Sequence, residues 1–280
     1  MHYHSHRWIL STVYKPQFSL SYKEILMKNL LLITCFTLLG STAASSALAD
    51  DHAAPRTSAL DGYFCNINDG KDMDDVMKVS AKWSDWASEN VSSPYAAWVM
   101  TPVAANVQAF PYDYFWLGVS ENHSDLGAVG DEWMTKGRSM QKQFDKTVAC
   151  ENHIIFSSME VKPLASREKP GFVQLASCQF TEDGNMASLM AADKKLSDWM
   201  DKNNMPGGIY RWFPGVGWSP NNQTDLFSVY TAESMAERGE AHDMMMAGGW
   251  QAADEIYGDV MACDSPQLYM AQPVGGKSAG

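Results

Sequence analysis

Apolar and polar positions follow two periods along this chain, and the same succession of predicted elements occurs twice. Between residues 71 and 89, apolar or small side chains recur with the i, i+3, i+4 spacing of an amphipathic helix, at Met73, Val76, Met77, Ser80, Trp83 and Ala87. Short apolar runs that end at Gly, Pro or polar residues predict strands on either side of this helix. The first half is therefore predicted to run strand, helix, strand, strand, helix, strand, over residues 62–67, 71–89, 96–100, 113–120, 124–148 and 152–161. The second half gives the same order, over residues 172–180, 186–203, 208–213, 225–230, 232–257 and 267–274.

One nine-residue segment occurs in both halves and indicates an internal duplication. It reads KWSDWASEN at residues 82–90 and KLSDWMDKN at residues 195–203, with five identical positions at a spacing of 113 residues. Cysteines bracket the two copies in the same way, 85 residues apart in each half, at Cys65 and Cys150 and at Cys178 and Cys263. Because self-similarity fixes the architecture of a chain, we expect two modules of the same fold.

The predicted order of elements in each half, β-α-β-β-α-β, is that of the ferredoxin-like unit. The fold class is expected to be α+β, with one unit at residues 58–165 and a second at residues 166–272. Two such units in tandem resemble the dimeric α/β-barrel superfamily, which includes antibiotic-biosynthesis-type monooxygenases, NIPSNAP-like and EthD-like domains and the haem-binding chlorite dismutase group. The resemblance rests on element order and duplication over residues 58–272. It implies a strand order of 4-1-3-2 in each unit and two sheets that join into one intramolecular barrel, with the helices outside.

The N-terminal region has the pattern of a secretory signal peptide that starts at Met27. Lys28 precedes an apolar run from Leu30 to Leu39, and small residues follow as far as Ala49. The apolar run is shorter than the roughly 20 residues that a permanent membrane anchor needs. The predicted regions are an upstream extension at 1–26, a signal peptide at 27–49 cleaved after Ala49, a disordered leader at 50–57 and a flexible tail at 273–280. The mature chain is then periplasmic or secreted, with no membrane insertion after cleavage, and the His2, His4 and His6 cluster lies outside it.

The composition of the mature chain narrows the classes of partner. Residues 50–280 contain 17 basic and 32 acidic side chains, a net charge of −15. Because so acidic a chain repels phosphate backbones, nucleic-acid binding is not expected. Four cysteines remain, which in an exported protein predicts disulfide bonds. The repeat favours a bond within each module, Cys65–Cys150 and Cys178–Cys263, over the other two possible connectivities.

Aromatic residues recur at matching places in the two modules and are the main candidates for a ligand site. In members of the superfamily that bind a ligand, the pocket lies between helix and sheet, and an aromatic-lined concave site is the usual form of a small-molecule site. The predicted ligand-binding residues are Trp86, Trp98, Trp116, His153, Trp199, Tyr210 and Trp212. The alternative is that the tryptophans fill the core, as large aromatics commonly do.

Three further sets of polar residues have both a functional and a structural interpretation. Asp85 and Asp198 are predicted either as general bases or as surface ion-pair partners of Lys82 and Lys195, and the spacing favours the second interpretation. His153 as a single histidine is a poor candidate for a haem ligand, since a ligating histidine needs a supporting partner. His242, Met245 and Met246 share a predicted helix face and form a weak candidate for Cu(I), with Met-rich packing as the alternative.

The sequence lacks the nucleophile elbow, the P-loop, the dinucleotide fingerprint and the zincin motif. Since no convergent catalytic set is recognisable, binding is favoured over catalysis, and no cofactor is predicted. The leading hypothesis is an exported, disulfide-bonded protein that binds a small apolar or aromatic molecule or a partner. The alternatives are a cofactor-independent enzyme resembling the monooxygenases or an isomerase, and a periplasmic copper-handling protein.

Overall fold

The strands of this computed structural model, which describes residues 55–165 and 169–277, belong to one antiparallel sheet. They are β1 (Thr57–Ile67), β2 (Tyr95–Ala104), β3 (Tyr114–Ser120), β4 (Val148–Lys162), β5 (Gly171–Phe180), β6 (Gly208–Pro214), β7 (Leu226–Ala232), β8 (Met261–Cys263) and β9 (Gln267–Lys277). The predicted signal peptide at 27–49, the upstream extension at 1–26 and the leader up to residue 54 lie outside the described residues.

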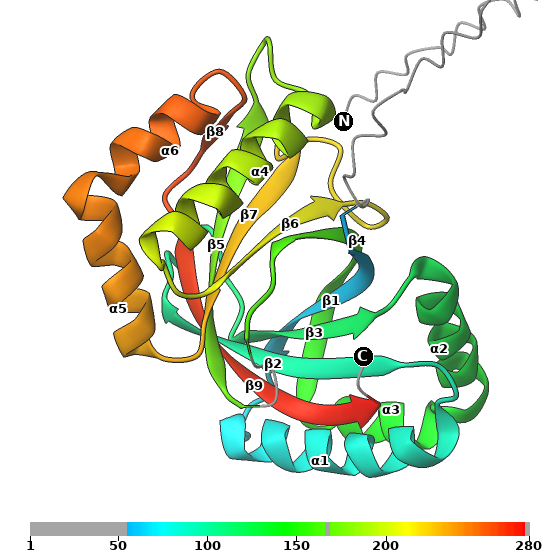
Figure 1. Cartoon of the computed structure of the whole chain (residues 1–280). Coiled ribbons are helices and arrows are strands. Elements are labelled where there is room, and N and C mark those ends of the chain that lie inside the picture. Colours follow the sequence, from blue (N-terminus) through cyan, green and yellow to red (C-terminus); the bar gives the residue numbers. More distant parts are fainter. Residues whose placement is uncertain (1–54, 166–168, 278–280) are drawn as a thin grey trace, which may run out of the picture. The chain divides into compact units, whose positions relative to one another are not determined.

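Eight of these strands close into a barrel (Figure 1). Their order is β7-β6-β4-β1-β3-β2-β9-β5, and pairing of β5 with β7 completes the ring. Within the first half the order is β4-β1-β3-β2, and within the second it is β9-β5-β7-β6. The two halves meet where β4 pairs with β6 and where β2 pairs with β9. The short strand β8 lies outside the ring and pairs with the end of β5.

Helices cover the outside of the barrel in two groups. The first half contributes α1 (Met73–Asn90), α2 (His123–Lys136) and α3 (Arg138–Phe144). The second half contributes α4 (Met186–Asn203), α5 (Met235–Met244), a π-helical turn at Met245–Gly249 and α6 (Trp250–Tyr257). Figure 1 shows α1–α3 against one part of the barrel wall and α4–α6 against another. Among the described helices, none combines the length and the apolarity needed to cross a membrane.

The predicted elements are all present, with three differences that have local causes. The helix predicted over residues 124–148 ends at Gly137, where a Cβ atom would lie 2.5 Å from the carbonyl oxygen of Trp133. The helix predicted over 232–257 is interrupted by the π-helical turn, which contains Gly248 at a φ of 123°. Strand β9 continues through Lys277, so residues 273–277 belong to the sheet rather than to a flexible tail.

Alternation along the strands separates two apolar cores. On β3, Phe115 and Leu117 pack inside the barrel, whereas Tyr114 and Trp116 pack under the helices of the first half. Because neighbouring residues of a strand point to opposite faces, a barrel wall that is buried on both sides is apolar at nearly every position. This alternation decides which predicted ligand residues share a cavity.

Specific contacts recur between the halves at a spacing of 112 or 113 residues. Both predicted disulfides, Cys65–Cys150 and Cys178–Cys263, are present. The recurring hydrogen bonds are Asn68 N to Thr147 O and Thr181 N to Val260 O, Asp113 N to Cys65 O and Asp225 N to Cys178 O, and the amide Nδ2 of Asn90 to Trp86 O and of Asn203 to Trp199 O. The positions flanking each first strand and each first helix are therefore held in the same way in both halves.

Candidate functional site

A cavity of about 620 Å³ lies in the first half, between helices α1, α2 and α3 and the outward faces of β1, β3 and β4. We call it the helix–sheet cavity. Its walls are largely aromatic, with side chains at Tyr63, Trp83, Trp86, Tyr95, Tyr114, Trp116, Trp133 and Phe144. A volume of this size and lining is typical of small-molecule sites in proteins.

The aromatic walls are held by edge-to-face packing. Trp83 lies edge-on to Trp116, with ring centroids 4.7 Å apart and an interplanar angle of 81°. Trp86 and Trp133 make the same kind of contact across the cavity wall, at 5.1 Å and 88°. Such arrangements match the positive edge of one ring to the negative face of the other. The tryptophans of α1 are therefore fixed by partners on β3 and α2.

The inner end of the cavity carries a buried carboxylate, Asp61 on β1, which is only 7% exposed. Its Oδ1 accepts a hydrogen bond of 2.9 Å from the Tyr95 hydroxyl, which in turn accepts one of 3.2 Å from Trp116 Nε1. This chain of bonds crosses β3 directly above Gly118, where a Cβ atom would lie 1.9 Å from the Tyr95 hydroxyl. Only glycine at this position lets the two side chains meet.

The pKa values of the two phenols beside Asp61 are raised. Burial is the main cause for both Tyr63 and Tyr95, and the negative charge of Asp61 adds to it. Since a raised pKa keeps a phenol neutral well above physiological pH, Tyr95 remains a hydrogen-bond donor to the carboxylate.

His153 on β4 completes the polar end. It is the cross-strand partner of Tyr63 in the β1–β4 ladder, and the two rings stack with centroids 3.9 Å apart and planes at 7°. Its Nε2 lies 3.7 Å from Asp61 Oδ2. With one ring face covered by Tyr63 and Nε2 turned to Asp61, His153 does not present Nε2 to a haem iron in the cavity. The residues here do not fit haem ligation through that atom.

Two glycines leave the space under α2 open. Gly127 and Gly130 lie one turn apart on the helix and line the cavity, and a Cβ atom at either would meet nothing within 4 Å. Glycine inside a helix costs about 0.5–1 kcal/mol relative to alanine. No steric requirement of the described structure explains this cost, whereas an open cavity does.

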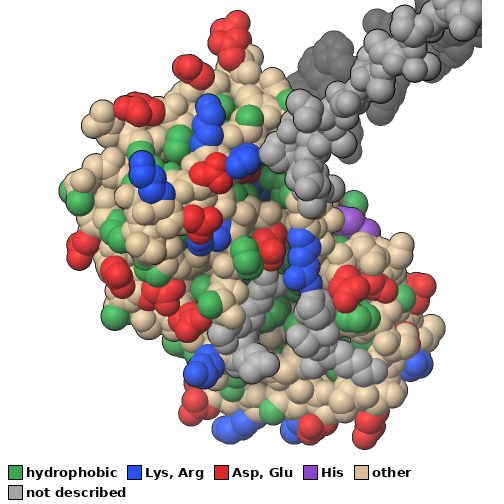
Figure 2. Space-filling view, in the orientation of Figure 1, with side chains coloured by type: hydrophobic (Ala, Val, Ile, Leu, Met, Phe, Trp, Pro, Cys, Tyr) green, Lys and Arg blue, Asp and Glu red, His purple; other side chains and the backbone are tan. Residues whose placement is uncertain are grey.

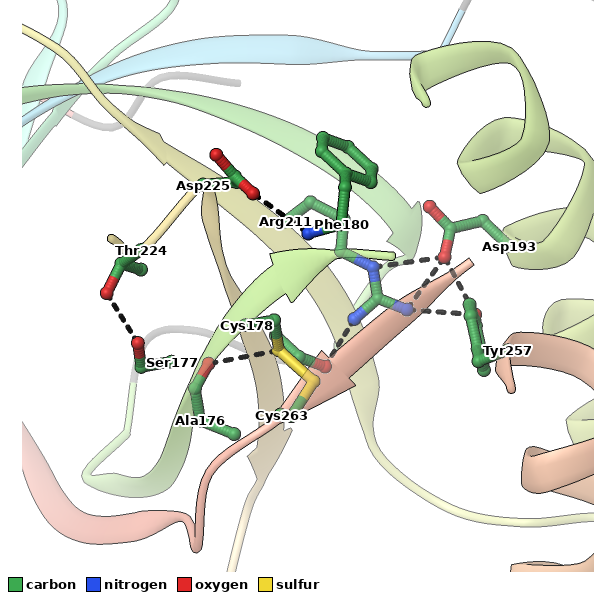
Figure 3. Close-up of a disulfide and its surroundings, with 11 residues drawn as sticks. Ala176, Ser177, Cys178, Phe180, Asp193, Arg211, Thr224, Asp225, Tyr257 and Cys263 are labelled. Atoms are coloured by element: carbon green, nitrogen blue, oxygen red, sulfur yellow. Dashed lines mark hydrogen bonds and ion pairs between the residues drawn. A yellow bond between two sulfur atoms is a disulfide. The ribbon is translucent and has the colours of Figure 1, made fainter. Parts of the chain in front are cut away.

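The corresponding positions of the second half are filled by a buried ion pair (Figure 3). Arg211 is 1% exposed, and its Nε and Nη2 donate hydrogen bonds of 3.0 and 2.7 Å to Asp193 Oδ1. The Tyr257 hydroxyl donates to the same oxygen at 2.7 Å, and Nη1 of Arg211 donates to Ser228 Oγ. In the first half the equivalent positions are Ala97, Ser80 and Phe144, as judged from the repeat and from Trp98 and Trp212.

The electrostatics of this ion pair keep both partners in their ordinary charge states. Burial alone would lower the pKa of Arg211, but Tyr257 and Asp193 together raise it. Burial is also the main cause of the raised pKa of Tyr257. The second half therefore encloses its own cation beside an aromatic ring, 5.3 Å from the ring centroid of Tyr257.

The predicted ligand residues are divided among three places. Trp86, Trp116 and His153 line the helix–sheet cavity. Trp98, Tyr210 and Trp212 face the inside of the barrel, where they line a smaller cavity of about 120 Å³. Trp199 packs against the core of the second half, beside Met200 and Met245.

The other predicted polar residues lie away from both cavities. Asp85 and Asp198 are exposed, and Asp198 pairs with Lys194 at 2.8 Å rather than with Lys195. In the Met-rich segment, Met245 packs against the core whereas Met246 is 67% exposed. Among the described His, Cys, Asp and Glu side chains, no group of three or more could hold a metal ion.

Several residues of the site were not predicted from the sequence. They are Asp61, Tyr63, Trp83, Tyr95, Trp133 and the two glycines of α2. Two signals in the sequence point to them: a carboxylate inside an otherwise apolar strand, and two glycines three residues apart within a predicted helix.

The fold and the cavity define the class of this protein: an α+β protein with a closed eight-stranded barrel and an aromatic cavity under the helices of its first half. No protein-family model and no curated protein matches the chain.

Solved structures resemble the fold. A monooxygenase candidate from Lactobacillus acidophilus NCFM gives a TM-score of 0.48 at 9% identity, over 80% of this chain and 97% of that chain. A mutant chlorite dismutase from Candidatus Nitrospira defluvii gives 0.47 at 7% identity, over 79% and 94%. An anthrone oxidase-like protein gives 0.46 at 12% identity, over 80% and 96%. At these values the likeness concerns the arrangement of the chain and says nothing about activity.

Proposed function

We propose that this chain is an exported protein that binds one small, largely apolar or aromatic molecule in the helix–sheet cavity. The observation that carries the proposal is the contrast between the halves. The first half has a cavity of about 620 Å³ with aromatic walls and two glycines beneath α2, and the second half carries a buried ion pair at the corresponding positions. Binding to a protein partner has less support, since the aromatic side chains face inward.

Two further elements of the proposal concern origin and location. The recurring disulfides and hydrogen bonds support an origin by duplication of a ferredoxin-like unit, after which only the first copy kept an open cavity. Two disulfides fit an exported protein, because such bonds persist in oxidising compartments. Export by the signal peptide at residues 27–49, with a mature chain that begins at Asp50, remains part of the proposal.

The proposed site is tested by filling the cavity. The variant Gly130→Leu places a side chain in the open space beneath α2, and it is expected to abolish binding of indole in calorimetric titrations. Gly239→Leu is the matched control, because Gly239 lies within α5 of the second half and its Cβ would also meet nothing within 4 Å. Both variants replace a helical glycine, so both are expected to gain about 0.5–1 kcal/mol of stability.

The comparison separates loss of the site from loss of the fold. The unmodified chain and Gly239→Leu are expected to bind one indole per chain, while Gly130→Leu binds none although its thermal stability is not reduced. Equal indole binding by both variants would contradict the proposed site.

A catalytic function is the second candidate, and one observation favours it. His153 Nε2 lies 3.7 Å from Asp61 Oδ2 at the wall of an apolar cavity, an arrangement suited to removing a proton from a bound molecule. This is the first step that a cofactor-independent monooxygenase-like or isomerase-like enzyme requires. Copper handling by the Met-rich segment has no comparable support, because Met245 and Met246 differ in burial.

Catalysis by His153 predicts exchange of acidic C–H protons. In deuterated water, the chain is expected to speed deuterium incorporation into 2-tetralone, and His153→Gln to reduce that rate roughly 100-fold. His242→Gln, which alters a histidine on α5 away from the cavity, serves as the control and should leave the rate unchanged. If exchange is followed by NMR and His153→Gln matches the unmodified chain, His153 is not the base.

A further inference from the structure

We infer that the molecule bound in the helix–sheet cavity is a cation, an ammonium or similar group attached to an aromatic or apolar body. This inference rests on the proposed function and adds the charge of the ligand. It starts from the charged residues of the lining. Asp61, Asp131 and Glu151 line the cavity, and among the described residues that line it none is Lys or Arg. Acidic side chains are also spread over both helical groups on the face drawn in Figure 2.

The position of Asp61 makes a cationic ligand more than a matter of overall charge. A carboxylate that is 7% exposed loses much of its hydration and is stabilised by hydrogen bonds or by an opposite charge. Tyr95 supplies a hydrogen bond to Oδ1, and the nearest basic group on the described chain is the His153 imidazole, 3.7 Å from Oδ2. A neutral imidazole leaves the negative charge uncompensated, and a bound ammonium group supplies the compensation.

The second half shows what a compensated carboxylate looks like in this fold. There a buried aspartate, Asp193, is paired with the guanidinium of Arg211, which also lies 5.3 Å from the ring centroid of Tyr257. The first half has Ala97 in place of Arg211, and a cavity beside its own carboxylate. The ligand cation therefore takes the part in the first half that Arg211 takes in the second.

The walls suit a cation as well as an apolar body. Trp83, Trp86 and Trp133 line the cavity, and indole rings are the strongest aromatic partners of cations. The glycines of α2 leave room for a bulky head group, since no side chain projects from Gly127 or Gly130. Anionic ligands are disfavoured, because they would enter a space that holds three carboxylates and no fixed cation among its described lining residues.

The charge is tested with three probes of nearly the same shape at pH 8, above the ordinary titration range of imidazole. They are phenyltrimethylammonium, which is permanently cationic, the neutral 2-phenylpropan-2-ol and the anionic 2-methyl-2-phenylpropanoate. In calorimetric titrations of the unmodified chain, the cation is expected to bind roughly tenfold more tightly than the alcohol, and the anion not at all. Asp61→Asn keeps an acceptor for Tyr95 and should remove most of that tenfold preference. Asp198→Asn, at an exposed position on α4, should retain it.

Each outcome decides a different claim. Equal or tighter binding of the alcohol or the anion by the unmodified chain would overturn the inference, whatever the variants do, and would leave the proposed function standing. Binding of indole without binding of the cationic probe has the same meaning. Failure of all probes, including indole, would remove the proposed function itself. If Asp61→Asn does not fold, the three probes on the unmodified chain still decide.

Discussion

Replacing Arg211 by methionine is expected to destabilise the chain by about 3–5 kcal/mol, the usual result of breaking a buried ion pair on one side. The substitution removes the guanidinium that donates two hydrogen bonds to Asp193, a residue only 4% exposed. Asp193 Oδ2 already lacks a hydrogen-bond partner among the described residues, so the remaining carboxylate would retain only the bond from Tyr257. Urea unfolding followed by circular dichroism measures the change.

The double variant Arg211→Met with Asp193→Leu is the control for this prediction. It removes both charges together, and replacing a buried pair by apolar side chains of similar volume is often neutral. The double variant is therefore expected to be more stable than the single one by several kcal/mol. If the two unfold at the same urea concentration, the cost does not come from an unpaired buried charge.

Loss of either disulfide is expected to have an effect of similar size. Each bond closes a loop over a sequence separation of 85 residues, and replacing both of its cysteines by serine should lower the stability by about 4–5 kcal/mol on the chain-entropy model. Because β4 pairs with β6 and β2 with β9, each half completes the barrel of the other. Unfolding is therefore expected to stay a single transition in both variants.

The two disulfide variants control each other. The pair Cys65→Ser and Cys150→Ser and the pair Cys178→Ser and Cys263→Ser remove bonds of equal sequence separation, so their midpoints in urea should shift by similar amounts. Two separate transitions, or a shift in only one of the two variants, would show that the halves do not depend on each other for stability.

The repeat in the sequence was sufficient to predict much of the fold. Matched spacings gave the within-half pairing Cys65–Cys150 and Cys178–Cys263, and periodicity placed the helix of residues 186–203 at its observed bounds. Closure of the barrel has no local signal, because it depends on pairs such as Trp98 with Pro273 that are far apart in the chain. The break at Gly137 depends on a close approach to Trp133 that glycine alone does not announce.

The site was predicted in part, and the reason for the misses is the same throughout. In a wall buried on both faces, apolar residues occur at every position, so the sequence does not show which face a tryptophan occupies. Trp98 and Trp212 fall inside the barrel, whereas Trp116 falls under the helices. Asp61 and Tyr95 meet only because Gly118 lies between them on the neighbouring strand, which requires knowledge of the register.

Native mass spectrometry of the exported protein is the most direct test of the proposal that the helix–sheet cavity holds a ligand. The account predicts the mass of a chain that begins at Asp50, with both disulfides formed and one small organic cation retained per chain. The retained mass should be absent from Gly130→Leu and present in Gly239→Leu. A retained metal, haem or flavin, or an organic molecule that Gly130→Leu keeps, would contradict it.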